Sequence, residues 1–519
     1  MTCPNCGTET DTGTPGWCGA CGTAQRIGAR ELTDWLLPGA RRLASVAADA
    51  DPLGWPDYPE RREAAREETG IDEAVLAVRG PLGGSGPEVV AVVWDFRFLG
   101  GSMSSGVGQT VAAAIDHATD AGLPVVLLPA TGGARMQEGM ASLVQMAATS
   151  VALTRHGEAR LVSVSVLRDP TTGGVFASHA NLTDVVLAES GATIGFAGPR
   201  VAEAMTGGPL PEGSHTARGA LAAGLVDAVV ARPDLPAVLA RVLAWPGRHA
   251  QADGDRQAAR ADDDTPRPAP VQPQDAWGEV EASRADDRPR TPDFLGALDV
   301  AFELRGDRSG GDDPTIRVAL ARLEDRPVVV VGMDTTRAEG RVSPGGYRKA
   351  WRGIGLAGRL GVPLVTLVDT PGADASAASE AGGIAHHIAR TFQVLLDVPV
   401  PAVSLVIGEG GSGGALALAV GDRLLIQEHA IFSVIAPEGA AAILHRDASK
   451  APEVAALLQP TAAKLHELGI ADEVVAEDVP DPVAAAWQAV ARHLAELDDR
   501  DGGKLVAGRR ERWRPAGAP

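Results

Sequence analysis

The stretches DPTTGGV (169–175) and GEGGSGGA (408–415) decide the fold of this chain. Each begins where an apolar strand ends, LVSVSVL (161–167) in the first case and SLVI (404–407) in the second. Each continues into small residues typical of a helix, and a strand, a turn and a helix in that order form the repeating unit of α/β proteins. Further apolar runs, each expected to form a strand, lie at 88–96, 123–130, 183–189 and 326–334, and helix-like stretches alternate with them. The sequence therefore predicts the α/β class.

The two halves of the chain repeat the same landmarks in the same order. The strand entry Gly122-Leu123-Pro124 returns as Gly361-Val362-Pro363, a shift of 239 residues, and Gly173-Gly174 returns as Gly413-Gly414, a shift of 240. One isolated Gly pair marks any tight turn, but ordered landmarks at a nearly constant offset indicate a fold used twice.

All four cysteines lie near the N-terminus, in two C-x-x-C pairs: Cys3, Cys6, Cys18 and Cys21. Two such pairs aim four thiolates at one point, which is typical of a tetrahedral structural zinc site, with iron as the less favoured metal. A disulfide pairing would require an oxidising compartment, which nothing else in the sequence supports. Four thiolates leave no open coordination position, so the sequence predicts a structural zinc ribbon.

Composition shifts divide the chain into segments. Its 519 residues exceed what one compact core usually holds, and the segment 246–274 is polar and rich in proline, as flexible linkers are. We expect a zinc ribbon over 1–30, a first domain over 31–245, a linker over 246–274 and a second domain over 275–519.

The charge balance limits the partners. The net charge of −20 disfavours binding of the whole molecule to nucleic acid or to an anionic membrane. No apolar run approaches the ~20 residues of a transmembrane helix, and the start MTCPNCG resembles no signal region, so we expect a cytoplasmic protein. Nucleic-acid contact by the ribbon stays open because arginines follow it, although helix capping and solvation explain them better: Arg26, Arg30, Arg41 and Arg42.

The two Gly pairs suit a particular chemistry. Where a strand turns into a helix, backbone N–H groups lack partners and point outward, and glycine lets a ligand oxygen approach them closely. Gly173-Gly174 and Gly413-Gly414 therefore predict two oxyanion holes, sites suited to carbonyl oxygens that gain negative charge. Close strand–helix packing also requires glycine, but two such turns in register favour the oxyanion interpretation.

Side-chain catalytic motifs are scarce. The sequence contains no phosphate-binding P-loop, no G-x-S-x-G elbow and no H-E-x-x-H. Glu138 and Glu409 lie beside Gly-rich turns, where acid–base and turn-stabilising roles are equally compatible with the sequence. A reaction promoted by backbone donors fits this pattern.

Several long motifs resemble a known enzyme family. The ribbon, WDFRFLGGSMSSGVGQ (94–109), ATGGARMQEGM (130–140) and DPTTGGV resemble the β subunit of bacterial acetyl-CoA carboxylase carboxyltransferase. PGGYRKAWR (344–352) and VIGEGGSGGALALAVGDR (406–423) resemble its α subunit. The resemblance covers nearly the whole chain except the linker. It implies both subunits fused with β first, and a crotonase-like fold in each half.

The resemblance also implies a reaction. It is carboxyl transfer from carboxybiotin, carried on a separate protein, to acetyl-CoA, which forms malonyl-CoA. By resemblance, Gly173 and Gly174 hold the thioester oxygen, while Gly413, Gly414 and the N–H of Ala415 hold the biotin ureido oxygen. The further residues implied are Gly132, Gly133 and Arg135 on the CoA side, and Gly346, Tyr347 and Gly372 on the biotin side.

The implied partners follow from what the sequence lacks. It has no biotinyl-lysine motif and no recognisable ATP-binding loop, so a biotin carboxyl carrier protein and a biotin carboxylase are expected as separate chains. The family pairs its halves across a subunit interface, which implies at least a homodimer. Two enzymatic alternatives remain open, a malonyl-thioester decarboxylase component and a preference for propionyl-CoA. A zinc-ribbon regulator that binds nucleic acid is the alternative from another class.

Overall fold

The computed structural model describes residues 3, 6–9, 13–46, 51–199, 202–203, 208–245 and 275–513. The chain forms two compact units, Met1–Pro246 with Arg308–Gly311, and Gly247–Asp307 with Asp312–Pro519. The linker expected over 246–274 lies outside the described residues. No helix in the described ranges is long and apolar enough to cross a membrane.

The first unit is built on a seven-stranded sheet. An antiparallel pair, β4 and β5, leads into a parallel series, because each later strand is reached through a crossover. In spatial order the strands are β11 (Ala228–Val230), β9 (Val185–Glu189), β7 (Ser163–Leu167), β6 (Val125–Leu128), β5 (Glu88–Trp94), β4 (Val75–Pro81) and β3 (Arg41–Arg42).

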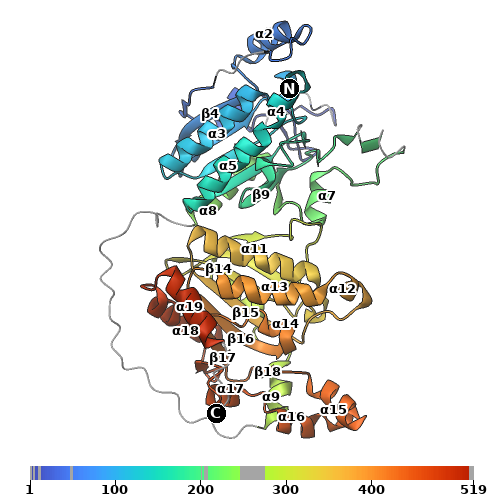
Figure 1. Ribbon diagram of the computed structural model, residues 1–519, viewed down its shortest axis with the longest axis vertical. Helices are drawn as coiled ribbons and strands as arrows, with labels where there is room; N and C mark the ends of the chain where they lie inside the picture. Colours follow the sequence, from blue (N-terminus) through green and yellow to red (C-terminus); the bar gives the residue numbers. More distant parts are fainter. Residues whose placement is uncertain are drawn as a thin grey trace. The chain divides into compact units, whose positions relative to one another are not determined.

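Helices α3 (Ser105–Asp120) and α5 (Gln145–Glu158) lie side by side in the first unit (Figure 1). Ser104 is the N-cap of α3. Its side chain accepts a hydrogen bond from the N–H of Val107 and so satisfies one of the free amides of the first turn. Among the described residues, this unit also contains the α-helices α1 (Ala29–Leu36), α2 (Tyr58–Thr69), α4 (Met140–Leu143), α7 (Ala217–Ala222) and α8 (Leu235–Ala244). The ribbon contributes the antiparallel strands β1 (Trp17–Cys18) and β2 (Thr23–Ala24).

The second unit repeats this topology. Its sheet again opens with antiparallel strands and continues in parallel, and β18 (Ile431–Ser433) pairs with the end of β16. In spatial order the strands are β12 (Asp299–Leu304), β13 (Ile316–Leu323), β14 (Arg326–Met333), β15 (Leu364–Thr370), β16 (Ala402–Gly411), β17 (Arg423–Gln427) and β19 (Glu473–Val475). The longer helices are α9 (Ala276–Ser283), α11 (Pro344–Leu360), α13 (Ile384–Asp397), α15 (Pro437–His445), α16 (Ala451–Leu458), α18 (Pro482–Leu497) and α19 (Gly502–Arg512), and the short helices are α10 (Thr291–Gly296), α12 (Ala377–Ala381), α14 (Ser412–Leu416) and α17 (Ala462–Glu467).

The strand order confirms the predicted α/β class and the internal repeat. The series β4-β5-β6-β7-β9-β11 matches β13-β14-β15-β16-β17-β19 strand for strand. In both units the Gly-rich turns follow the third strand of the parallel series, β7 or β16, counting from β5 or β14. The duplicated scaffold therefore presents each turn at the carboxyl end of a buried parallel strand, where α/β proteins bind ligands.

Candidate active site

The first Gly-rich turn is packed against a second one from the preceding crossover. Thr172 donates its N–H to the C=O of Thr131 at 3.0 Å, and Thr131 donates its N–H to the C=O of Pro170 at 2.6 Å. A Cβ placed on Gly173 would lie 2.7 Å from the Cα of Gly133, so Gly173 has no room for a side chain; Gly133 has φ +114°, which also favours glycine. The structure thus brings together the predicted pairs Gly132-Gly133 and Gly173-Gly174.

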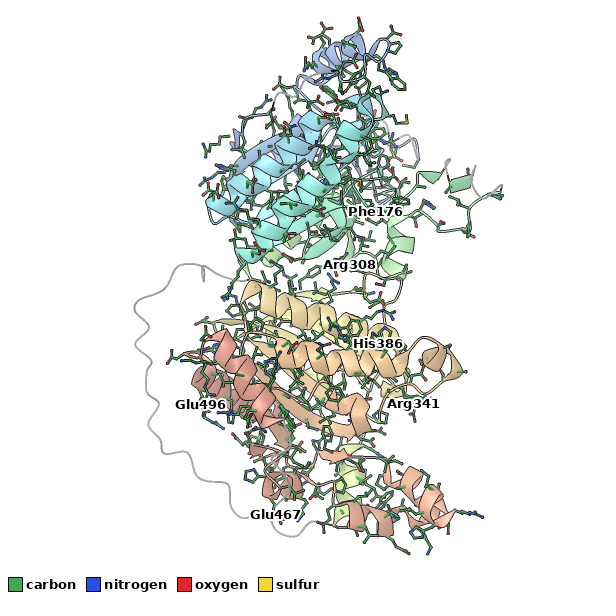
Figure 2. All side chains as sticks on the ribbon, in the orientation of Figure 1. Phe176, Arg308, Arg341, His386, Glu467 and Glu496 are labelled. Carbon is green, nitrogen blue, oxygen red and sulfur yellow. The ribbon has the colours of Figure 1, made fainter. Side chains whose placement is uncertain are left out.

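The two amides of the first pair differ in what they contact. Gly173 has φ +70° and donates its N–H to the C=O of Phe196 at 2.8 Å, so this donor is already occupied. Gly174 is half-buried, and within the described ranges its N–H donates no hydrogen bond to another backbone group. Figure 2 marks this turn by Phe176, two residues further along the chain. Of the two predicted donors, the Gly173 amide is thus engaged by the protein, while the Gly174 amide has no backbone acceptor within the described ranges.

Arg135 turns away from the surface. It is 1% exposed, and Nη1 donates to Glu73 Oε2 at 3.0 Å and to the hydroxyl of Tyr58 at 3.1 Å. Its Nε and Nη2 donate to the hydroxyl and C=O of Ser102 at 3.0 and 2.9 Å. Every nitrogen of the guanidinium is engaged inside the unit, so Arg135 supports the 131–135 turn from beneath. Contact between Arg135 and CoA stays a prediction, which these internal hydrogen bonds disfavour.

The second turn joins β16 to α14. Ser412 has φ +61°, a left-handed conformation that L residues rarely adopt. Gly413 is exposed, and a Cβ added to it would find no atom within 4 Å. Gly414 is buried: its Cβ would lie 2.8 Å from both the N of Ala373 and the hydroxyl oxygen of Tyr347. Ala415 is also buried.

The hydrogen-bond register corrects the predicted equivalence of the two Gly pairs. Thr131 bridges to Thr171, and its counterpart Thr370 pairs with Gly410, a shift of 239 residues on both strands. The left-handed residue two positions later is Gly173 in the first unit and Ser412 in the second. The matching amides are consequently those of Gly174 and Gly413. Aligning the Gly pair 173–174 with the Gly pair 413–414 implies a shift of 240 residues, one more than the shift of 239 that the strand pairing gives.

The residues predicted on the biotin side lie beneath the second turn. Tyr347 is fully buried and donates its hydroxyl to the C=O of Gly414 at 3.1 Å; burial raises its pKa, so it stays a neutral donor. Gly372 has φ +140° and donates its N–H to the hydroxyl of Thr370 at 2.9 Å. A Cβ on Gly346 would lie 2.7 Å from Asp313 Oδ2. Tyr347 and Gly372 thus adjoin the turn directly, while Gly346 lies on α11 against Asp313.

Both glutamates left open by the sequence stabilise structure. Glu138 is buried and accepts hydrogen bonds from the hydroxyl of Tyr58 at 2.6 Å and from the N–H of Ser105 at 2.6 Å. Glu409 is buried and forms a two-bond ion pair with Arg284. The turn-stabilising interpretation therefore holds for both.

The four cysteine sulfurs form one cluster. All four Sγ atoms lie within 4.8 Å of one another, with 3.6 Å between Cys3 and Cys21 and 3.5 Å between Cys6 and Cys18. Four sulfurs about 2.3 Å from a tetrahedral zinc ion would be about 3.8 Å apart, so the cluster fits a Cys₄ metal site. Of the arginines that follow the ribbon, Arg26 bonds to Asp169 and Arg30 to the C=O of Gly70, which favours a structural role for both.

Comparisons with known proteins agree in both units. Residues 53–234 match the family model "Carboxyl transferase domain", and residues 269–517 match "Acetyl co-enzyme A carboxylase carboxyltransferase-like". The acetyl-coenzyme A carboxylase carboxyl transferase subunits beta/alpha of Salinispora tropica is 45% identical over 96% of this chain and 92% of its own length. A probable biotin-dependent acyl-coenzyme A carboxylase beta3 subunit of Mycobacterium bovis is 38% identical over 92% of this chain and 97% of its own. Among solved structures, transcarboxylase 12S has the same fold, with a TM-score of 0.73, 21% identity and coverage of 92% and 90%.

The duplicated crotonase-like fold, with a Gly-rich turn in each unit, defines a biotin-dependent carboxyltransferase of acyl-CoA carboxylation. More particularly, the chain belongs to the acetyl-CoA carboxylase carboxyltransferase family in the form that fuses the β and α subunits. The resemblance stated from sequence motifs is confirmed, as are the fold class and the type of reaction.

Proposed function

We propose that this enzyme transfers the carboxyl group of carboxybiotin to acetyl-CoA and releases malonyl-CoA. The N–C bond of carboxybiotin breaks, a C–C bond forms at the acetyl methyl carbon, and the methyl proton passes to the biotin nitrogen. The observation that carries the proposal is the pair of equivalent turns, each with a glycine amide, Gly174 or Gly413, after a left-handed residue. Backbone donors suit this reaction because charge develops on oxygen at both substrates.

The two donors act on different oxygens in this scheme. Gly174 donates to the thioester oxygen, which becomes negative when the methyl group loses its proton. Gly413 donates to the ureido oxygen of biotin as its nitrogen loses the carboxyl group. Losing one such donor costs about 3 kcal/mol in enzymes that use oxyanion holes. Gly173, Gly132 and Gly133 keep the first turn free of side chains, whereas Gly346, Gly372 and Tyr347 support the second. The N–H groups of Gly414 and Ala415, which follow Gly413, are proposed as further donors to the ureido oxygen.

We also propose zinc as the metal of the cysteine cluster, in a structural role. Purified protein is expected to contain about one zinc ion per chain, and Cys18→Ser to lose it, since three thiolates hold zinc less tightly than four. Elemental analysis measures the metal, and thermal unfolding is expected to shift downward because the ribbon packs on the first unit. Stoichiometric iron, or an unchanged metal content in the variant, would contradict this assignment.

The working assembly includes further chains. We propose that a separate biotin carboxyl carrier protein delivers the carboxyl group, that a separate biotin carboxylase loads the carrier, and that the chain forms at least a homodimer. A cytoplasmic location keeps the four thiols reduced for the metal. The proposed segments are a ribbon over 1–30, a β-like domain over 31–245, a linker over 246–274 and an α-like domain over 275–519.

A competition assay tests the function. Acetyl-, propionyl- and butyryl-CoA are supplied together with one carboxylated carrier, and the products are separated by chromatography. Malonyl-CoA as the main product is expected. Preferential carboxylation of propionyl-CoA would change the assigned substrate, while carboxylation of biotin from malonyl-CoA without forward transfer would indicate a decarboxylase component.

A further inference from the structure

An arginine holds a carboxylate just before each proposed donor amide. In the first unit Arg26 Nε donates to Asp169 Oδ2 at 3.0 Å, and the guanidinium lies 4.4 Å from the ring centroid of Phe96. The other oxygen of Asp169 accepts the N–H of Thr193 at 3.0 Å. Asp169 thereby ties the start of the turn that ends at Gly174 to the ribbon.

The second unit has a matching contact. Arg284 donates to both oxygens of Glu409, from Nε at 2.9 Å and from Nη2 at 2.6 Å, and its Nη1 donates to Glu438 at 2.6 Å. The N–H of Glu409 itself donates to Asp369 Oδ1 at 3.1 Å. Glu409 precedes Gly413 by four residues, much as Asp169 precedes Gly174 by five.

Neither arginine comes from the repeated strands. Arg26 follows β2 of the ribbon, and Arg284 is the C-cap of α9, so each lies in the segment that precedes the sheet of its own unit. The two segments are unlike in fold, yet each supplies a guanidinium to a carboxylate shortly before the donor amide; in the shared register Glu409 lies one residue beyond the counterpart of Asp169. The burial differs: the Arg26 side chain is 51% exposed, while Arg284 and Glu409 are 34% and 10% exposed. Water screens the first pair more than the second.

We infer that Arg26 and Arg284 are positioning residues, which fix the donor amides of Gly174 and Gly413 through Asp169 and Glu409. The inference rests on the proposed function of these amides. A glycine turn is conformationally soft, and a displacement of about 1 Å at a reacting group can cost on the order of 100-fold in rate. Charge-assisted hydrogen bonds at the strand end restrict that displacement. The ribbon thus has a part in catalysis that needs no contact with substrate.

The test compares truncations with conservative variants in the full chain. We expect Arg284→Ala to lower kcat by about 10- to 30-fold and Arg26→Ala by about 3- to 10-fold, with each KM changed less than twofold. Lysine at either position keeps a charged donor and is expected to restore part of the rate. Arg284→Ala combined with Glu409→Gln is expected to be no slower than Arg284→Ala, because both act through one contact. Amide hydrogen exchange of peptides spanning 169–177 or 409–417 should speed up only in the matching variant.

Arg155→Ala is the control matched to Arg26→Ala, because the Arg155 side chain is 50% exposed against 51% for Arg26 and forms ion pairs with Asp116 and Asp120 on α3, outside the two turns. The inference is overturned if the arginine variants keep the kcat of this control, or if the losses at Arg284 and Glu409 add. It is also overturned if KM rises and kcat stays constant. Gly174→Val separates the two claims: full turnover in that variant would contradict the proposed function itself.

Discussion

Gly413→Val is expected to lower the rate of carboxyl transfer by about 100-fold or more without unfolding the enzyme. Gly413 is exposed, and a Cβ at this position meets no atom within 4 Å, so the fold can accept the larger side chain. The isopropyl group would instead fill the space in front of the amide that we assign to the ureido oxygen. Steady-state transfer from carboxylated carrier to acetyl-CoA measures the rate, and thermal unfolding measures the fold.

Ser412→Gly is the neighbouring control for this prediction. Ser412 has φ +61°, a strained conformation for serine, so glycine should raise stability by about 1 kcal/mol and leave the rate nearly unchanged. A rate loss in Ser412→Gly as large as that in Gly413→Val would show that the turn is merely sensitive to change. Full activity in Gly413→Val would remove Gly413 from the proposed site.

Much of the fold could be predicted because it depends on local pattern. The apolar run at 88–96 forms β5, and the runs at 123–130 and 183–189 form β6 and β9. The internal repeat also followed from sequence, since its landmarks recur in order. The sequence did not reveal which residue of the second turn matches Gly174 of the first. The run GEGGSGGA contains several glycines, and nothing in the sequence indicates that Ser412 has a left-handed backbone. Only the pairing of Gly410 with Thr370 aligns the two turns.

The role of Arg135 lay beyond local pattern for another reason. Its partners Glu73 and Tyr58 precede it by 62 and 77 residues, so no motif around 131–135 contains them. One sequence feature does indicate that the turn forms without Arg135. Both units contain the motif T-x-G, at Thr131 and at Thr370, and in each the threonine hydroxyl accepts the N–H of the glycine two residues later. That shared turn holds its shape in the second unit, where no arginine follows. Arg135 is therefore an addition of the first unit alone.

Arg135→Met is expected to destabilise the first unit by about 3 kcal/mol while leaving the KM for acetyl-CoA within twofold of the unchanged enzyme. The substitution leaves Glu73 buried with Arg62 as its remaining ion-pair partner at 2.8 Å, and removing one member of a buried ion pair costs about 3–5 kcal/mol. Tyr58 would also lose a donor, although its hydroxyl keeps Glu138. Urea unfolding followed by tryptophan fluorescence measures the stability, and kinetics below the transition measure KM.

Combining Arg135→Met with Glu73→Gln should recover part of the loss, because the buried negative charge is then gone. An unchanged unfolding curve together with a tenfold rise in KM would instead place Arg135 against CoA, as the sequence motif alone had implied.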